Sequence, residues 1–265
     1  MVTSSLLLGT KALITGASSG LGLAMAKALA QSGATVVITA RDADKLAEAQ
    51  AQLIAAKLAV QVLPLDVRDE ASVAEAVRWV RTHWGGLDLL VNNAGIGMRT
   101  VNPDFLTNPQ PFYEVSAEGF RDLIDTNLTG YFLVAKAFVP LFLAQGRGKI
   151  VNISMNHETM RRRGFIPYGP SRAGAESLSL IMAEDLKEHH IDVNMLLPGG
   201  ATDTGMIPEN AKAAIAGKFQ LLSPEVMAEP IVFLASTMSD GITGERIVAT
   251  DFEAWKALVR PDIEE

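Results

Sequence analysis

The chain has 265 residues, of which 48% are hydrophobic and 20% are charged, a composition typical of globular proteins. It contains no cysteine, which excludes disulfide bonds, thiolate metal sites and a cysteine nucleophile. The formal net charge of -7 disfavours nucleic-acid binding. The leucine run at 6–8 is too short for a signal peptide or a membrane span. We therefore expect a cytoplasmic protein that binds neither nucleic acid nor membrane.

Short apolar runs alternate with segments of helical period along the chain. Strands are predicted at 11–15, 35–39, 60–66, 87–95, 148–154 and 191–200, and helices at 21–33, 43–57, 71–85, 117–146 and 171–190. The strands are apolar on both faces and most precede a helix, which indicates a parallel sheet covered by helices on both sides. No repeat or low-complexity linker interrupts this pattern, so one domain over 1–265 is expected.

Two long stretches, 97–116 and 155–167, show no regular period. Both follow the carboxyl ends of predicted strands, which is where ligands bind in parallel sheets. Loops of this length in a compact domain are often functional. We interpret them, together with about 204–222, as the segments that would contact a substrate.

The segment TGASSGLG at 15–22 joins the first predicted strand to the first helix. Gly16, Gly20 and Gly22 remove side chains where the backbone must turn tightly and approach a ligand. The free N–H groups of the following helix then face an anion. In the first strand–helix turn of such a sheet, this anion is the pyrophosphate of a dinucleotide. A tight turn that binds nothing is the alternative.

The second predicted strand ends in VITARD, which bears on the choice of dinucleotide. Thr39 stands where a carboxylate would accept a hydrogen bond from the ribose 2′-hydroxyl of NAD. Arg41 follows two residues later, and an arginine fork suits the 2′-phosphate of NADP. The pattern favours NADP(H), with NAD(H) possible. The alternative is that Arg41 is a solvated loop cation and Asp42 points outward.

The segment YGPSRAG at 168–174 places Tyr168 four residues before Arg172, so both side chains share one face of a helix. A positive charge about 4 Å away stabilises a phenolate by about 4 kcal/mol at an effective dielectric constant of about 20. This favours a tyrosine that exchanges protons with a substrate. The alternative is an ordinary surface pair one helical turn apart.

These motifs stand in the order typical of the short-chain dehydrogenase/reductase family, which the chain resembles from about residue 9 to 250. The resemblance is carried by TGASSGLG, NNAG at 92–95, Asn127 in DTNLTG, Tyr168, PGG at 198–200 and ITGERI at 242–247. It implies a single Rossmann-type α/β domain of three layers, with a seven-stranded parallel sheet and helices on both faces. It also implies an oxidoreductase that interconverts a carbonyl and a secondary alcohol of a small molecule.

The resemblance further implies which residues would bind the dinucleotide. These are Gly16, Ser18, Gly20, Leu21, Asp66, Val67, Asn93, Ala94, Gly95, Pro198 and Gly199, with Thr202 or Thr204. Asp66 would bind the adenine edge, and Asn93 to Gly95 would pass under the adenosine ribose. The two threonines flank the position of the hydroxyl that binds the carboxamide, and both stay candidates.

For the reaction itself, the resemblance implies that Tyr168 is the general acid in reduction and the general base in oxidation. Members of the family carry lysine where this chain has Arg172, and this lysine also contacts the nicotinamide ribose. The family's serine falls at Met155, so Ser154 is the favoured substrate donor and Asn156 the alternative. Asn127 matches the asparagine whose backbone carbonyl holds a water in a proton relay.

Met155 and Arg172 depart from the family pattern, and they leave a second class of function open. A protein that binds a dinucleotide without turnover, as a scaffold or sensor, would need neither a substrate hydroxyl nor a lysine. The helices at 123–143 and 171–188 are more apolar than one buried face requires. Because members of the family that the chain resembles often pair these two helices into tetramers, a homo-oligomer, a dimer or tetramer, is expected. Packing of both helices on their own sheet is the alternative.

Overall fold

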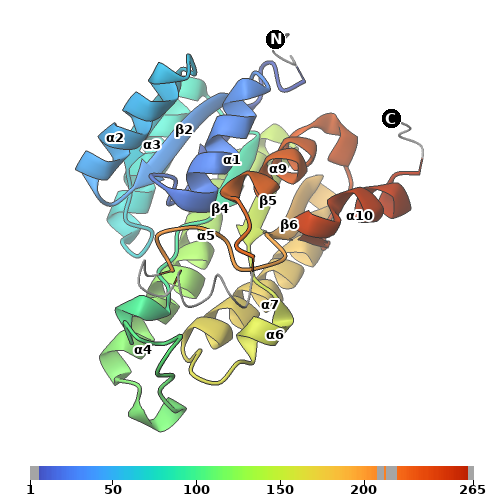
Figure 1. Ribbon diagram of the computed structural model, residues 1–265. Helices are drawn as coiled ribbons and strands as arrows, with labels where there is room; N and C mark the ends of the chain where they lie inside the picture. The colour runs from blue at the N-terminus through green and yellow to red at the C-terminus, as the bar shows by residue number, and fades with distance from the viewer. Residues whose placement is uncertain (1–5, 208–211, 213–219, 262–265) are drawn as a thin grey trace.

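The computed structural model describes residues 6–207, 212 and 220–261, and seven strands in this part form one parallel sheet (Figure 1). The strands are β1 Lys11–Ile14, β2 Thr35–Ala40, β3 Val60–Pro64, β4 Leu89–Asn92, β5 Gly148–Ile153, β6 Ile191–Leu197 and β7 Arg246–Val248. Their order is β3-β2-β1-β4-β5-β6-β7, and every pair is parallel. The predicted seven-stranded α/β fold is confirmed.

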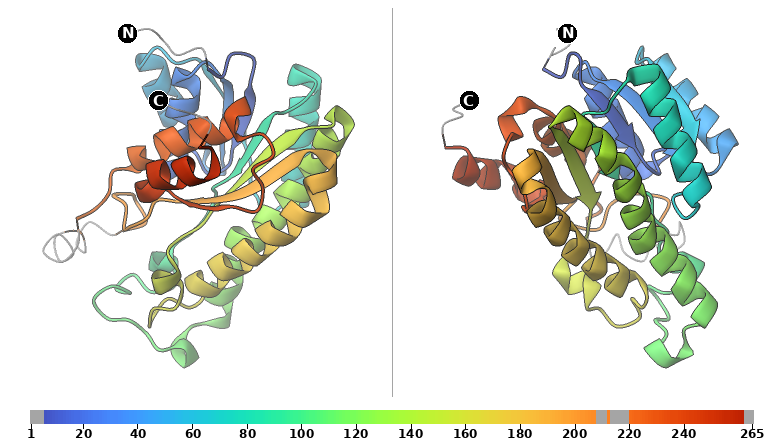
Figure 2. Two further views of the ribbon diagram at one scale, coloured as in Figure 1. Left: turned by 90° about the vertical axis from the view of Figure 1, so that its right-hand side faces the viewer. Right: turned by 180° about the vertical axis from the view of Figure 1, so that it is seen from behind.

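Helices cover both faces of the sheet and give the molecule three layers (Figure 2). They are α1 Gly20–Gln31, α2 Ala43–Ala55, α3 Glu70–Trp84, α4 Ala117–Ile124, α5 Gly130–Gln145, α6 His157–Met160, α7 Tyr168–Leu186, α9 Ala228–Ala235 and α10 Phe252–Val259. One apolar core joins α1, α2, α9 and α10 to the sheet, and the other joins α3, α5 and α7. The short helices α4 and α6 lie in a lobe beyond the carboxyl ends of the strands (Figure 1).

The strand order reverses between β1 and β4, and this determines where a ligand can enter. Chains that leave β1 and β4 turn to opposite sides, which opens a crevice at their carboxyl ends. The glycine-rich turn follows β1, and NNAG follows β4. Both predicted motifs therefore lie at this crevice.

The prediction of one regular helix over 117–146 is wrong. It is divided into α4, a π-helical turn at Asp125–Thr129, and α5. In the turn the Gly130 N–H bonds to the carbonyl of Asp125, five residues earlier, so one extra residue is accommodated. Gly130 permits this because a Cβ there would lie 2.7 Å from Val67 Cγ2. Such turns often occur at functional sites, and this one contains Asn127.

The helical run Ala117–Gln145 is apolar and long enough to cross a membrane by length and composition. In this structure 44% of the apolar 18-residue stretch within this run is buried inside the protein. Val134, Phe138 and Phe142 lie in the core on the α5 side of the sheet, so the hydropathy of the run is that of a core helix.

Several expected boundaries are also corrected. The helix expected at 171–190 begins at Tyr168 and ends at Leu186, followed by a 3-10 turn at Lys187–His189. Pro170 fits in its first turn, where a helix needs no intrahelical N–H donor. The predicted strands at 60–66, 87–95 and 191–200 end at Pro64, Asn92 and Leu197. Their last predicted residues leave the sheet and form the crevice.

A chain of buried polar side chains fixes α7 against the sheet. The Asn92 amide on β4 donates to Asn152 Oδ1 on β5 (2.9 Å), and the Asn152 amide donates to Ser179 Oγ on α7 (2.7 Å). All three residues are at most 1% exposed. Because a buried polar group without a partner is costly, this chain specifies one position of α7, and therefore of Tyr168 at its start.

We predict that Asn152→Leu lowers the free energy of unfolding by roughly 2–4 kcal/mol, because it leaves Asn92 and Ser179 without their shared partner. Urea denaturation followed by circular dichroism measures this change. Ser179→Ala, which leaves only one amide unpaired, should cost about half as much. Equal stability of Asn152→Leu and the unmodified protein would contradict the stabilising role of the hydrogen-bonded chain from Asn92 to Ser179.

Candidate active site

The turn after β1 has the shape required of a phosphate cradle. Gly16 and Gly20 have φ angles of 63° and 56°, which favour glycine. A Cβ on Gly16 would lie 2.5 Å from Ala94 Cα, and one on Gly20 would lie 3.2 Å from Thr204 Cγ2. The N-cap residue of α1, Ser19, makes no side-chain capping bond, so no side chain of the cap competes for the first N–H groups of the helix. The residues present therefore fit an anion such as a dinucleotide pyrophosphate.

The NNAG motif after β4 is hydrogen-bonded to this turn. The Asn93 amide donates to the carbonyls of Thr15 and Gly16, both at 2.9 Å. The Thr15 hydroxyl accepts from the backbone N–H groups of Asn93 and Ala94, both at 3.0 Å. Gly22 has no room for a side chain, because a Cβ would lie 2.5 Å from Asn93 Nδ2. The structure thus brings together the two motifs, which are more than 70 residues apart.

The end of β2 leaves one cation exposed beside the crevice. Asp42 is the N-cap of α2 and accepts from the N–H groups of Asp44 and Lys45, both at 3.1 Å. The Lys45 backbone N–H, first among several contacts, lowers the pKa of Asp42. Thr39 is fully buried, and Arg41 is exposed. Asp42 is therefore engaged by its own helix, which leaves Arg41 as the exposed charged residue where β2 ends.

Asp66 lies beyond β3 and is paired with a residue that sequence reasoning missed. Arg68 Nε donates to Asp66 Oδ1 (3.1 Å) and Arg68 Nη2 donates to Oδ2 (2.8 Å). This hydrogen bonding lowers the pKa of Asp66 below its ordinary value. The side chain of Val67 is buried and packs against Gly130, so only its backbone is available to a ligand. The alternation of charges at 66 and 68 was the available sequence signal for the pair.

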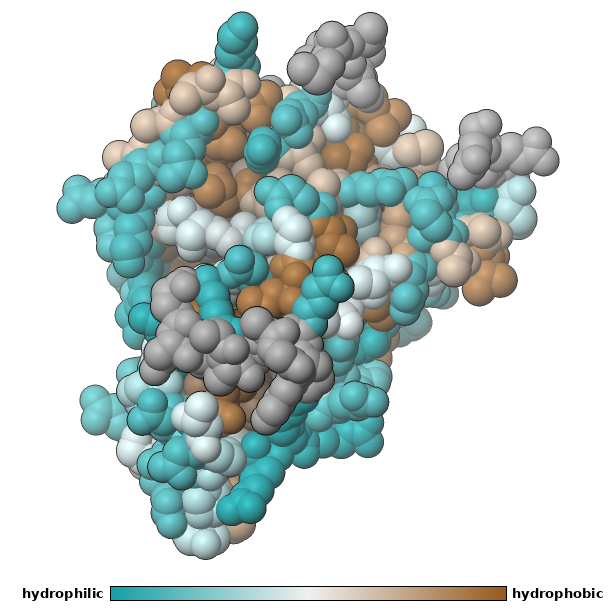
Figure 3. Space-filling view, viewed as in Figure 1, coloured by the Kyte–Doolittle hydropathy of each residue, from teal (hydrophilic) through white to brown (hydrophobic). Residues whose placement is uncertain are grey.

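Tyr168 begins α7 and faces an apolar pocket. Its hydroxyl lies 3.8 Å from Met206 Sδ. Tyr168 packs against an apolar cluster of Met98, Phe105, Leu123 and Phe165, against which Ile96, Val101, Leu106 and Met155 also pack. Hydrophobic surface is visible at the centre of this face, between the sheet and the lobe (Figure 3). The tyrosine therefore presents its hydroxyl to thioether and hydrocarbon groups.

Arg172 is buried one helical turn after Tyr168, and only 2% of it is exposed. Its Nη1 donates to Tyr131 Oη (2.7 Å) and to the carbonyl of Ile153 (2.9 Å). Its guanidinium carbon lies 5.3 Å from the centroid of the Tyr168 ring and 5.6 Å from that of Tyr131. Burial acts to lower the pKa of Arg172, but Tyr131 and Tyr168 outweigh it and raise the pKa above its ordinary value.

Asn127 lies in the π turn and is fully buried. Its Oδ1 accepts from the N–H of Ile96 (2.8 Å), and its Nδ2 donates to the carbonyl of Ile96 (2.9 Å) and to Ser171 Oγ (3.4 Å). The side chain therefore holds the segment after NNAG against α7. Its backbone role in a proton relay stays a prediction.

Ser154 and Asn156 both use their donors elsewhere. The Ser154 hydroxyl donates to Glu176 Oε1 (2.5 Å), and the Asn156 amide donates to the carbonyl of Gly199 (2.9 Å). Glu176 also accepts from Arg246 Nε (2.8 Å), and its Oε2 lies 3.0 Å from His157 Nε2. The residue between the two candidates, Met155, packs against the same apolar cluster as Tyr168.

The family of the chain follows from this geometry together with its similarity to known proteins. Residues 10–214 match the short chain dehydrogenase family. The chain belongs to the short-chain dehydrogenase/reductase family. It is therefore an oxidoreductase, as are its named relatives.

Two relatives illustrate the range of the family. The chain is 37% identical to gluconate 5-dehydrogenase of Gluconobacter oxydans over 191 residues. This aligned region covers 72% of this chain and 71% of the relative. It is 32% identical over 246 residues to 3-oxoacyl-[acyl-carrier-protein] reductase FabG of Escherichia coli, covering 90% and 95%.

Solved structures share the fold. A putative short-chain alcohol dehydrogenase of Sinorhizobium meliloti has a TM-score of 0.80 at 32% identity, covering 94% of this chain and 98% of that chain. A gluconate 5-dehydrogenase of Burkholderia cenocepacia, in complex with NADP and tartrate, also has a TM-score of 0.80, at 27% identity and with 95% and 98% covered.

The segment after β6 closes the crevice of this dehydrogenase. Pro198 is half-buried, Gly199 has a φ of 97°, and its carbonyl is the acceptor for Asn156. The Thr202 hydroxyl donates to the carbonyl of Gly200 (3.3 Å). The methyl group of Thr204, in contrast, lies over Gly20 at the start of α1. Of the predicted substrate segment 204–222, residues 208–211 and 213–219 lie outside the described residues.

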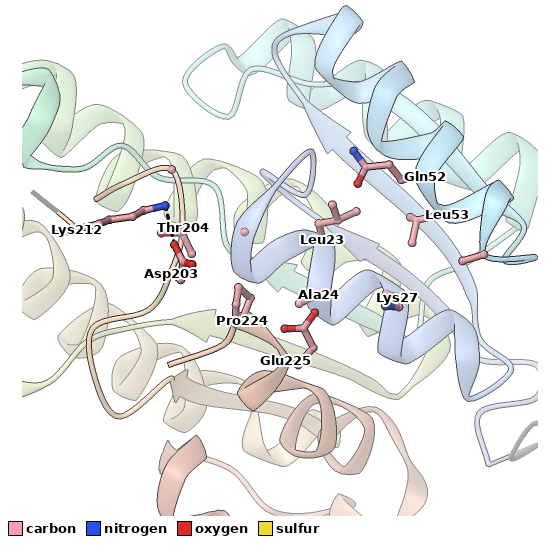
Figure 4. Close-up of a pocket in the computed structure, with 13 residues that line it drawn as sticks. Leu23, Ala24, Lys27, Gln52, Leu53, Asp203, Thr204, Lys212, Pro224 and Glu225 are labelled. Atoms are coloured by element: carbon pink, nitrogen blue, oxygen red, sulfur yellow. Dashed lines mark ion pairs between the residues drawn. The ribbon is translucent and has the colours of Figure 1, made fainter. Parts of the chain in front are cut away.

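A groove of about 420 Å³ opens beside the start of α1 (Figure 4). It lies between α1, α2, the segment 203–205 and Pro224–Glu225. Its charged side chains are of both signs, and Lys212 pairs with Asp203 at 2.7 Å. Because Gly20 and Thr204 line it, the groove borders the phosphate cradle.

We predict that Gly95→Ala disturbs the site, because a Cβ there would lie 2.6 Å from Arg172 Nη2 and 3.1 Å from Asn127 Oδ1. Overpacking of this kind costs roughly 1–3 kcal/mol, and thermal unfolding should show it as a lower Tm. Gly97→Ala is the matched control, since its Cβ would meet only Met206, at an ordinary 3.5 Å. Equal Tm values for the two variants would contradict the close approach of the guanidinium.

Proposed function

We propose that the chain is an NADP(H)-dependent oxidoreductase that interconverts a carbonyl and a secondary alcohol of a small molecule, with Tyr168 as general acid and base. The observation that carries this proposal is the position of Tyr168. It begins α7 beside the sheet crevice, with the buried Arg172 cation 5.3 Å from its ring. A tyrosine placed in this way can exchange a proton with a ligand in the crevice.

NADP(H) would occupy the crevice and supply or accept the hydride. Gly16, Ser18, Gly20 and Leu21 would hold its pyrophosphate at the start of α1. At the adenosine end, the residues proposed are Arg41, Asp66, Val67, Asn93, Ala94 and Gly95. At the nicotinamide end they are Pro198, Gly199 and Thr202 or Thr204. Support for NADP comes from Arg41 and from the relative solved with NADP.

In reduction, the Tyr168 hydroxyl would donate its proton to the developing alkoxide, and in oxidation the phenolate would accept it. The Arg172 guanidinium would stabilise the phenolate, because it is buried, close and permanently charged. Arg172 would also contact the nicotinamide ribose. The backbone carbonyl of Asn127 would hold a water that returns the proton to solvent.

Either candidate hydrogen-bond donor to the substrate oxygen would first have to break an existing hydrogen bond. Ser154 would have to leave Glu176, or Asn156 would have to leave the carbonyl of Gly199, before either could donate to a carbonyl. This observation favours a second candidate, a dinucleotide-binding protein that acts as a scaffold or sensor with little or no turnover. The two candidates share the cofactor and differ in whether hydride reaches a substrate.

The surface of the long helices supports a homo-oligomer, a dimer or tetramer, and we propose that the protein is cytoplasmic. Phe132 and Leu143 on α5, and Leu180 and Ile181 on α7, are between 43% and 57% exposed. Exposed apolar side chains on two neighbouring long helices favour a shared interface over contact with water. The substrate would be a small-molecule carbonyl or alcohol, the class to which gluconate belongs.

The decisive experiment follows NADPH absorbance while a panel of ketones, keto acids and sugar acids is added. We expect turnover with at least one compound and a loss of about 10²–10⁴-fold in kcat for Tyr168→Phe, because the proton donor is removed. Trp79→Phe is the control, since Trp79 lies on α3 and is not among the residues proposed for the site. NADPH binding without turnover by the unmodified protein would favour the scaffold or sensor.

Cofactor choice gives an independent prediction. Arg41→Asp should weaken NADPH binding about ten- to a hundredfold and strengthen NADH binding, because a carboxylate repels the 2′-phosphate and accepts from a ribose hydroxyl. Fluorescence titration with both cofactors measures the two Kd values. Arg78→Asp is the control, because Arg78 is an exposed cation on α3 that is not among the proposed cofactor residues. An unchanged ratio of the two Kd values would remove Arg41 from the site.

A further inference from the structure

We propose that Tyr131 is a positioning residue that holds the Arg172 guanidinium beside Tyr168, so that Tyr131 and Arg172 together replace a single lysine. This inference rests on the proposed function of Tyr168. It concerns a buried tyrosine on α5 that no step of the proposed reaction uses. Tyr131 is 1% exposed and lies directly after the π turn.

Three elements meet at the Tyr131 hydroxyl. It accepts from Arg172 Nη1 on α7 (2.7 Å) and donates to the carbonyl of Ile153, the last residue of β5 (3.3 Å). Arg172 Nη1 donates to the same carbonyl (2.9 Å). The phenol, the guanidinium and the carbonyl therefore form a closed triangle. One edge of the guanidinium is fixed with respect to the end of β5.

The guanidinium needs this acceptor more than an ammonium would. Arginine carries five N–H donors in a rigid plane, and each buried donor without a partner is costly. Nε of Arg172 is already buried without a partner. The Tyr131 hydroxyl accepts from the guanidinium at 2.7 Å, and the Tyr168 hydroxyl interacts with it less strongly. Without Tyr131, rotation towards other acceptors would move the charge relative to Tyr168.

A phenol suits this role because it binds the cation without cancelling its charge. Burial raises the pKa of Tyr131 more than Arg172 lowers it, so the hydroxyl remains neutral. A carboxylate at this position would form an ion pair and remove most of the field at Tyr168. The titratable groups that act on Arg172 are Tyr131 from α5 and Tyr168 from α7.

The guanidinium also needs space on its other edge, which Gly95 provides. A Cβ at Gly95 would lie 2.6 Å from Arg172 Nη2. The planar group is thus confined between the backbone after β4 and the Tyr131 hydroxyl, with the rings of Tyr131 and Tyr168 at 5.6 and 5.3 Å. Tyr131 defines which position it takes within that space.

The test is a double-mutant cycle of Tyr131→Phe and Arg172→Lys, read by kcat against pH for alcohol oxidation and by Tm. In the unmodified background, Tyr131→Phe should lower kcat about tenfold and move the acidic limb of the profile up by about one pH unit, because the phenolate loses part of its cationic support. In the Arg172→Lys background, the same change should alter kcat less than about twofold, since lysine makes no planar fork for the phenol to orient.

Phe138→Leu is the structural control, because Phe138 is fully buried on the same helix. It should lower Tm and leave the pH profile where it was. Coincident pH profiles for Tyr131→Phe and the unmodified protein, or equal effects of Tyr131→Phe in both backgrounds, would overturn the inference. An unmodified protein without turnover would contradict the proposed function instead. The Tm cycle would then decide whether the two side chains are coupled.

Discussion

A full positive charge buried between β5, α5 and α7 is the constraint on which the site depends. Arg172 is 2% exposed, and a buried cation is stable only where acceptors and space surround it. The structure supplies a backbone carbonyl at the end of β5, a phenol on α5 and a missing side chain at Gly95. A lysine ammonium would need fewer acceptors and less space. The buried guanidinium is therefore accommodated by residues on three separate elements.

The sheet determines where this charge lies. Reversal of strand order between β1 and β4 opens the crevice, and the hydrogen bonds among Thr15, Asn93 and Ala94 hold its two rims together. The polar chain from Asn92 through Asn152 then fixes α7 on the next strand. As a result, the phosphate cradle and Tyr168 are related through backbone hydrogen bonds and buried amides rather than through mobile loops.

Six of the seven strands could be predicted from the sequence because apolar runs and helical periods are local signals, and the seventh was implied by the family resemblance. The glycine-rich turn and NNAG were equally readable, since each follows the end of a strand. The π turn was not, because it depends on the contact between Gly130 and Val67 from another strand end. Nor was the role of Tyr131 or Glu176, which become partners of site residues only through packing between distant elements. Side-chain direction at 154–156 was also beyond the sequence, because it depends on where β5 ends.

That last point determines how the substrate oxygen can be held. Successive side chains of an extended chain point to opposite sides, so Ser154 and Met155 cannot both face Tyr168. Glu176, two helical turns after Tyr168, accepts from the serine hydroxyl, and Arg246 from β7 donates both to Glu176 and to the carbonyl of Met155. This ion pair therefore fixes the backbone of Met155 relative to α7. With the serine held in this way, the proposed proton donor Tyr168 and the cation behind it would supply most of the polarisation of a bound carbonyl. The precise placement of Arg172 by Tyr131 therefore matters more here than in a site with a serine donor.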